Sequence, residues 1–199
     1  MSAPSPSLVQ EALSAMRGVA ALAMGDRKGP GWFDFSDRGL VGSFIALLAV
    51  IGINAGLPLL LGIEGARGSA LRSVITFVVL LGAQLAAAAL VLRQIGRQDG
   101  LVPYIVADNW AIFTITMVTV LLSLLGVGNE LTLLAIMLLV LIVQVNIARL
   151  VVTLSVGQIV LFLIAQLVGG MVGLLIILMT LPLPPELAAE LAQQAARAQ

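Results

Sequence analysis

The chain of 199 residues contains no cysteine and no histidine, and only 10% of its residues are charged. Without cysteine, disulfides, thiolate chemistry and zinc–thiolate sites are excluded. Without histidine, the chain lacks the commonest general base, the commonest metal ligand and the usual proton relay. Ten basic residues balance ten acidic ones, and nothing resembles the clustered cations that nucleic acids require. We therefore expect no enzymatic activity, no metal or cofactor and no nucleic-acid partner.

Long apolar segments dominate instead, and 60% of the residues are hydrophobic. The longest segment, residues 131–181, carries a single charge, Arg149. A helix needs about 20 apolar residues to span a bilayer, so this segment is long enough for two spans. Its polar stretch at residues 149–158 (RLVVTLSVGQ) marks the break. The pattern predicts a helical hairpin with spans at about 131–148 and 159–181.

The whole chain is predicted to be an all-α, polytopic transmembrane helix bundle of about five spans. The three preceding spans are expected at about 40–61, 72–92 and 110–125, which leaves residues 93–109 as the longest internal loop. The bundle, residues 40–182, follows a polar arm, residues 1–39, that contains no apolar segment of the kind found in signal peptides. A short polar tail, residues 183–199, completes the chain. Its partners are expected to be the lipid bilayer and another membrane protein or further copies of itself.

The arm contains a predicted amphipathic helix at residues 7–24. Ser7 is suited to cap its N-terminus, with Gln10 three residues later as a capping box requires. Apolar residues then recur with a helical period, and Gln10, Ser14 and Arg17 occupy the other face. Such a helix either lies in the membrane interface or packs against the protein's own loops, and the sequence leaves both open.

The arm also holds two closely spaced carboxylates, Asp34 and Asp37, among aromatic residues. A catalytic acid pair is one interpretation. Capping of the first spanning helix is favoured, because acidic residues and serine before a helix accept hydrogen bonds from its free amides.

Small and polar residues inside the spans are the candidate interaction sites. Gly52 with Gly56, and Gly169 with Gly173, have the four-residue spacing that lets another helix approach closely. Five amide side chains also lie within spans: Asn54, Gln84, Gln144, Asn146 and Gln166. They either form separate hydrogen bonds between helices or converge to line a path for a neutral solute.

Basic residues predict the orientation. With five spans, seven of the ten fall in the N-terminal arm and the loops on its side of the membrane. Because cytoplasmic loops are enriched in Lys and Arg, we expect the N-terminus in the cytoplasm and the C-terminus in the periplasm. Asp108 and Arg149 would then both lie at the inner face, where an unpaired charge is costly. We expect Arg149 to pair with Asp108 or to bond Asn109.

Three short motifs suggest a relationship: WFDFSDRG at residues 32–39, Ser43–Phe44, and ADNW at residues 107–110. Together with five spans and the N-terminal helix, they resemble small bacterial inner-membrane proteins related to the Yip1 family. Eukaryotic members of that family are implicated in membrane trafficking and bind small GTPases. The resemblance implies a five-span membrane protein without a catalytic motif.

The function that these features favour is that of a scaffold, assembly factor or accessory subunit acting through helix–helix contacts. The alternative is a small transporter or channel for a neutral solute. Convergence of the five amides on one cavity would favour the alternative, and their dispersal would favour the first.

Overall fold

The computed structural model describes residues 7–60, 62, 66–181, 193–194 and 196–197, and within them it is helical without strands. The predicted tail, residues 183–199, falls mostly outside the described residues. The elements, with their bounds, are α1 (Leu8–Ala23), η1 (Gly29–Trp32), α2 (Asp37–Leu60), α3 (Ala66–Gln94), η2 (Gln98–Gly100), α4 (Leu101–Leu124), α5 (Glu130–Asn146), η3 (Ile147–Val151) and α6 (Val156–Thr180).

Five of these helices are long and apolar enough to cross a membrane, which confirms the predicted fold class. Each of the five has the length and the apolar composition that a span requires, because a bilayer core of about 30 Å needs about 20 apolar helical residues. The spans are Asp37–Leu57, Ala70–Gln94, Gln98–Leu124, Glu130–Val151 and Val156–Thr180.

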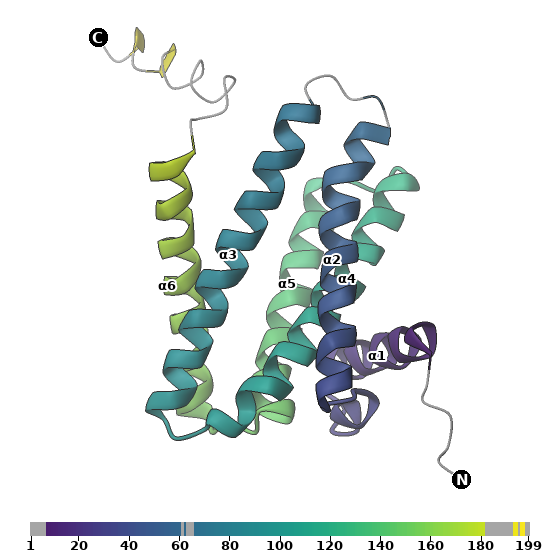
Figure 1. Ribbon diagram of the computed structural model, residues 1–199, viewed down its shortest axis with the longest axis vertical. Helices are drawn as coiled ribbons and strands as arrows, with labels where there is room; N and C mark the ends of the chain where they lie inside the picture. Colours follow the sequence, from purple (N-terminus) through teal and green to yellow (C-terminus); the bar gives the residue numbers. More distant parts are fainter. Residues whose placement is uncertain (1–6, 61, 63–65, 182–192, 195, 198–199) are drawn as a thin grey trace.

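The helices form an antiparallel bundle with α1 lying across one end (Figure 1). Most contacts of α6 are with α3, while α2 packs against both α3 and α4. The end of the bundle that carries α1 also holds the α3–α4 connection and the α5–α6 turn (Figure 1). We refer to it as the α1 end. The connections that were expected on one side of the membrane therefore do share one end.

The third span begins earlier than expected. Residues 101–109 belong to α4 and not to a loop. Pro103 does not prevent this, because proline is tolerated in the first turn of a helix, where its missing amide has no partner to lose. The side chains of Asp108 and Asn109, at the end of the predicted loop, are buried among helices.

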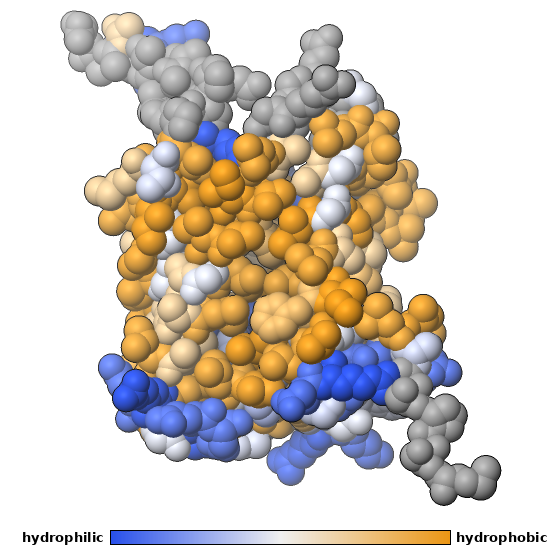
Figure 2. Space-filling model, in the orientation of Figure 1, coloured by the Kyte–Doolittle hydropathy of each residue, from blue (hydrophilic) through white to orange (hydrophobic). Residues whose placement is uncertain are grey.

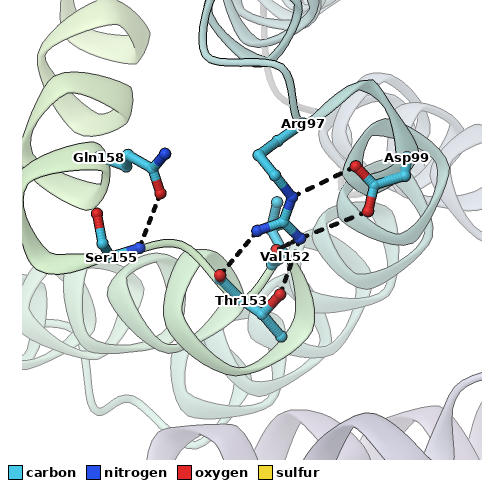
Figure 3. Close-up of polar contacts among 6 residues, drawn as sticks. All are labelled: Arg97, Asp99, Val152, Thr153, Ser155 and Gln158. Atoms are coloured by element: carbon cyan, nitrogen blue, oxygen red, sulfur yellow. Dashed lines mark hydrogen bonds and ion pairs between the residues drawn. The ribbon is translucent and has the colours of Figure 1, made fainter.

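The predicted break between the last two spans is confirmed, and it is a π-helical turn, η3, followed by a short non-helical link, residues 152–155. Thr153 in this link has a φ of 57°, a conformation that is uncommon for residues other than glycine. The Arg97 guanidinium supports it by donating hydrogen bonds to the Thr153 carbonyl oxygen at 2.9 Å, to Thr153 Oγ1 at 2.8 Å and to the Val152 carbonyl oxygen. Asp99 pairs with the same guanidinium (Figure 3). Arg97 therefore joins the α3–α4 connection to the α5–α6 turn.

The buried core lies toward the α1 end. The largest fully buried side chains include Trp110 of α4, Phe162 of α6, Leu92 of α3 and Leu22 of α1. Toward the other end the same helices carry exposed apolar side chains, among them Leu121, Leu124 and Leu178. An apolar surface of this kind covers most of the visible face of the molecule (Figure 2). The helices are thus held together mainly at the α1 end.

Candidate functional site

The five intramembrane amides are dispersed among separate contacts. Asn146 Nδ2 donates to the Leu22 carbonyl oxygen of α1 at 2.8 Å, and Gln166 Nε2 donates to Tyr104 Oη at 3.1 Å. Asn54 Nδ2 returns to its own helix, at the Val50 carbonyl oxygen. Gln144 donates to Asp108, while Gln84 is exposed on α3 beside Gly170 of α6. Gln144, Asn146 and Gln166 therefore bond to other helices, whereas Asn54 bonds within its own helix.

The structure does not form the expected ion pair between Asp108 and Arg149. Asp108 is only 5% exposed, and its Oδ1 accepts a hydrogen bond from Gln144 Nε2 of α5. Arg149 is exposed in η3, and Asp108 and Arg149 form no salt bridge among the described residues. The amide of Gln144 serves Asp108 instead, because it lies inside the bundle where a long cationic side chain would have to leave water.

Asn109 is likewise not bonded to Arg149 in the described structure. Its Nδ2 donates to Ser43 Oγ of α2 at 3.1 Å, and Ser43 in turn donates to the Leu40 carbonyl oxygen at 2.8 Å. Both side chains are fully buried. The two neighbouring residues of α4 therefore bond in different directions, Asp108 to α5 and Asn109 to α2. They tie the three helices together.

Glu11 is a buried polar residue that the sequence did not reveal. It is 8% exposed, and a Cβ placed on Gly42 of α2 would overlap its carboxylate. Its Oε1 is buried without a hydrogen-bond partner among the described residues. Burial raises the pKa of Glu11, Asp34 raises it further, and Arg38 opposes both effects. Glu11 lies in the first turn of α1, where an acid interacts favourably with the helix N-terminus.

The raised pKa predicts that the docking of α1 depends on pH. Burial favours the protonated form of Glu11, so the stability that Glu11 adds to the docking of α1 is fully present below its ordinary pKa of 4.5. This stability is lost as the pH rises past the raised pKa of the buried carboxyl group. Hydrogen exchange of the α1 amides, followed from acidic to neutral pH, should show protection that falls in the wild-type protein relative to Glu11→Gln. Identical pH profiles for the two proteins would contradict this.

Asp34 and Asp37 are not gathered into a catalytic pair with a common partner. Asp34 Oδ1 accepts a hydrogen bond from the Ser36 amide at 3.0 Å, and bonding to Ser36 lowers the pKa of Asp34. Asp37 begins α2, where an acid interacts favourably with the helix N-terminus. Among the described residues, no group of three acidic, histidine or cysteine side chains could hold a metal ion.

The two glycine pairs differ in what covers them. A Cβ on Gly169 would lie 2.8 Å from Ala87 Cβ and 3.0 Å from the Ala83 carbonyl oxygen, and Gly173 is similarly close to Leu80 and Ala83. This pair therefore lets α6 approach α3. At Gly52 and Gly56 a Cβ would meet none of the described residues within 4 Å. These two glycines line a mainly apolar groove of about 270 Å³ along α2, together with Ala49, Ile53, Leu57 and Leu60.

A second, larger cavity of about 390 Å³ lies between α2 and α3 and is lined in part by Asn54, Arg72, Ser73 and Thr76. It combines an amide and hydroxyls with one cationic residue. Of the five amides, Gln144, Asn146 and Gln166 are engaged elsewhere, in the contacts described above.

No family model matches this chain, and neither a curated protein nor a solved structure matches it. Its function has to be inferred from its own contacts and surfaces. Among the described residues, the groove along α2 and the cavity between α2 and α3 are candidate binding places.

Proposed function

We propose that this protein is a non-catalytic integral membrane protein that serves as a scaffold, assembly factor or accessory subunit by binding a transmembrane helix of another protein. The proposed binding site is the groove along α2. The resemblance to Yip1-related proteins is kept as part of the proposal, because a five-span architecture without a catalytic motif agrees with it.

The uncovered glycine pair is the observation that carries this proposal. Inside a bilayer, helices associate through close packing, and small residues are the surfaces that permit it. The same chain shows the principle at Gly169 and Gly173, where α3 already occupies the site. Gly52 and Gly56 have the same spacing but lie open within a span. A partner helix bound at Gly52 and Gly56 would pack as closely against α2 as α3 packs against α6 at Gly169 and Gly173.

The proposed location is the bacterial inner membrane, with the α1 end in the cytoplasm. Seven basic residues belong to the arm or lie at or next to the connections at this end: Arg17, Arg27, Lys28, Arg38, Arg93, Arg97 and Arg149. The bias toward one end supports this orientation, since Lys and Arg are retained on the cytoplasmic side.

A small transporter for a neutral solute is the second candidate. The cavity beside Asn54 supports it, since its volume of about 390 Å³ and the few polar groups in its mainly apolar lining are suited to a small molecule. The dispersal of the other amides weighs against a continuous path. Purification separates the two candidates, because a stoichiometric membrane partner indicates an accessory subunit and a monodisperse homo-oligomer alone favours transport.

The test compares Gly52→Leu/Gly56→Leu with Gly82→Leu after purification in mild detergent through a C-terminal tag. The paired substitution adds bulk to the groove at two positions where a Cβ would meet none of the described residues within 4 Å. Gly82 of α3 also faces open space, so it controls for the added apolar bulk. We expect the stoichiometric partner to be lost from the double variant and kept by the control. Equal recovery of the partner with both proteins would refute the groove as the binding site.

A further inference from the structure

Helix α1 has a second apolar face that the bundle does not cover. Its buried face, formed by Glu11, Ala15, Gly18 and Leu22, packs on the protein. On the opposite side an apolar stripe recurs at helical spacing and includes side chains with exposed fractions of 68% at Val9, 54% at Leu13 and 77% at Met24, the residue that follows the helix. Met16 and Ala20 complete this outer stripe. A helix that only packed against the protein would be expected to turn polar residues outward.

The polar residues of α1 lie along one edge and not on the outer stripe. Gln10, Ser14 and Arg17 follow one another at helical spacing between the buried and the outer face. Ser14 Oγ donates to the Trp32 carbonyl oxygen at 2.7 Å, and the Arg17 guanidinium lies 5.7 Å from the centre of the Trp32 ring. The exposed Trp32 thus sits beside the polar edge, as aromatic residues do at the level of lipid headgroups.

Helix α1 lies beside the apolar surface of the spans. α1 lies crosswise at the end of the bundle beside α2 (Figure 1), and the first half of α2 carries the exposed apolar residues Val41, Phe44, Ile45 and Leu48. The apolar face of the molecule reaches down to the hydrophilic rim at the α1 end, where α1 lies (Figure 2). Because the surface of α2 within its span faces lipid, a continuous neighbouring surface at the rim meets the same phase.

We propose that α1 lies in the bilayer interface while it remains docked on the bundle, with its outer stripe in the acyl–headgroup boundary and its polar edge toward water. The occupant of the outer stripe is lipid. Transfer of the exposed apolar side chains of the outer stripe from water into lipid is favourable, and this holds α1 at the membrane surface. This inference concerns the arm and does not depend on the groove along α2.

The absence of cysteine makes a direct test simple. Val9→Cys, Leu13→Cys and Ala20→Cys are each spin-labelled in nanodiscs of phosphatidylcholine with a minor share of phosphatidylglycerol. Collision with oxygen reports lipid, and collision with a nickel chelate reports water. We expect a positive depth parameter, the logarithm of the oxygen-to-nickel ratio, at all three positions. Val41→Cys is the lipid standard, and Gln10→Cys and Lys28→Cys are the water standards.

Two outcomes would overturn the proposal. Nickel collision at the stripe positions as frequent as at Lys28 would place the stripe in water. Low collision with both reagents, at positions that are exposed in the chain itself, would mean that another protein covers the stripe. Each labelled variant changes an exposed or polar-edge residue, so retention of a monodisperse protein is the check that the fold is intact.

Discussion

Gly169→Ala is expected to destabilise the protein, whereas Gly170→Ala one residue away should leave its stability nearly unchanged. A methyl group on Gly169 would meet Ala87 Cβ at 2.8 Å and the backbone of Ala83 at 3.0 Å, so α3 and α6 would have to separate. Overpacking of this kind costs about 1–3 kcal/mol. On Gly170 the same methyl group would meet Gln84 Nε2 at 3.5 Å, an ordinary contact. The change is measured as the midpoint of thermal unfolding in detergent.

The cost should be high because α3 is the main neighbour of α6, which otherwise contacts α4 through Phe162 and Gln166. Most of its contacts are with α3, and many of its other side chains are exposed to the membrane. Both variants introduce the same residue at adjacent positions of one helix, so helix propensity cancels between them. Equal midpoints for the two variants would show that α3 and α6 do not pack closely at Gly169.

The glycine pairs show how far sequence reasoning reaches. The spacing identified both pairs, because close approach of helices depends on small residues at that interval. It could not tell that α3 covers Gly169 and Gly173 whereas Gly52 and Gly56 stay open. That difference depends on which helices are neighbours. Because all five spans are apolar, their hydropathy says little about which of them pack together.

The fold was predictable to a greater extent than the polar contacts. Hydropathy identified five spans and the hairpin break, since lipid imposes length and polarity on each span separately. The predicted start of α4 and the predicted partner of Asp108 were both wrong, for the same reason. From sequence alone, a buried polar residue cannot be distinguished from a loop residue unless its hydrogen-bond partner is known. The partner of Asp108 comes from α5, 36 residues further along the chain. The burial of Glu11 was not predictable for a similar reason, because it depends on Gly42 of α2, whose missing side chain leaves space for the Glu11 carboxylate.

Gln144→Leu is expected to lower the stability of the protein by more than the double variant Asp108→Leu/Gln144→Leu does, measured as the midpoint of thermal unfolding in detergent. The single change removes the donor to Asp108 and leaves a carboxyl group buried at 5% exposure. An orphaned buried polar group costs about 1–3 kcal/mol, whereas replacing both partners by apolar groups of similar shape is close to neutral. Asp108→Leu alone should lie between the two, since it orphans an amide and not a carboxyl group.

Arg149→Gln separates this account from the ion pair that the sequence suggested. Because Arg149 is exposed in η3, its replacement should move the unfolding midpoint little. If Asp108 depended on Arg149, the Arg149 variant would lose stability to the extent that Gln144→Leu does, and the double variant Asp108→Leu/Gln144→Leu would show no recovery. Recovery in the double variant together with a silent Arg149 change would establish that α4 and α5 are joined by a carboxyl–amide contact inside the bundle, where a neutral partner avoids the desolvation that a cation would suffer.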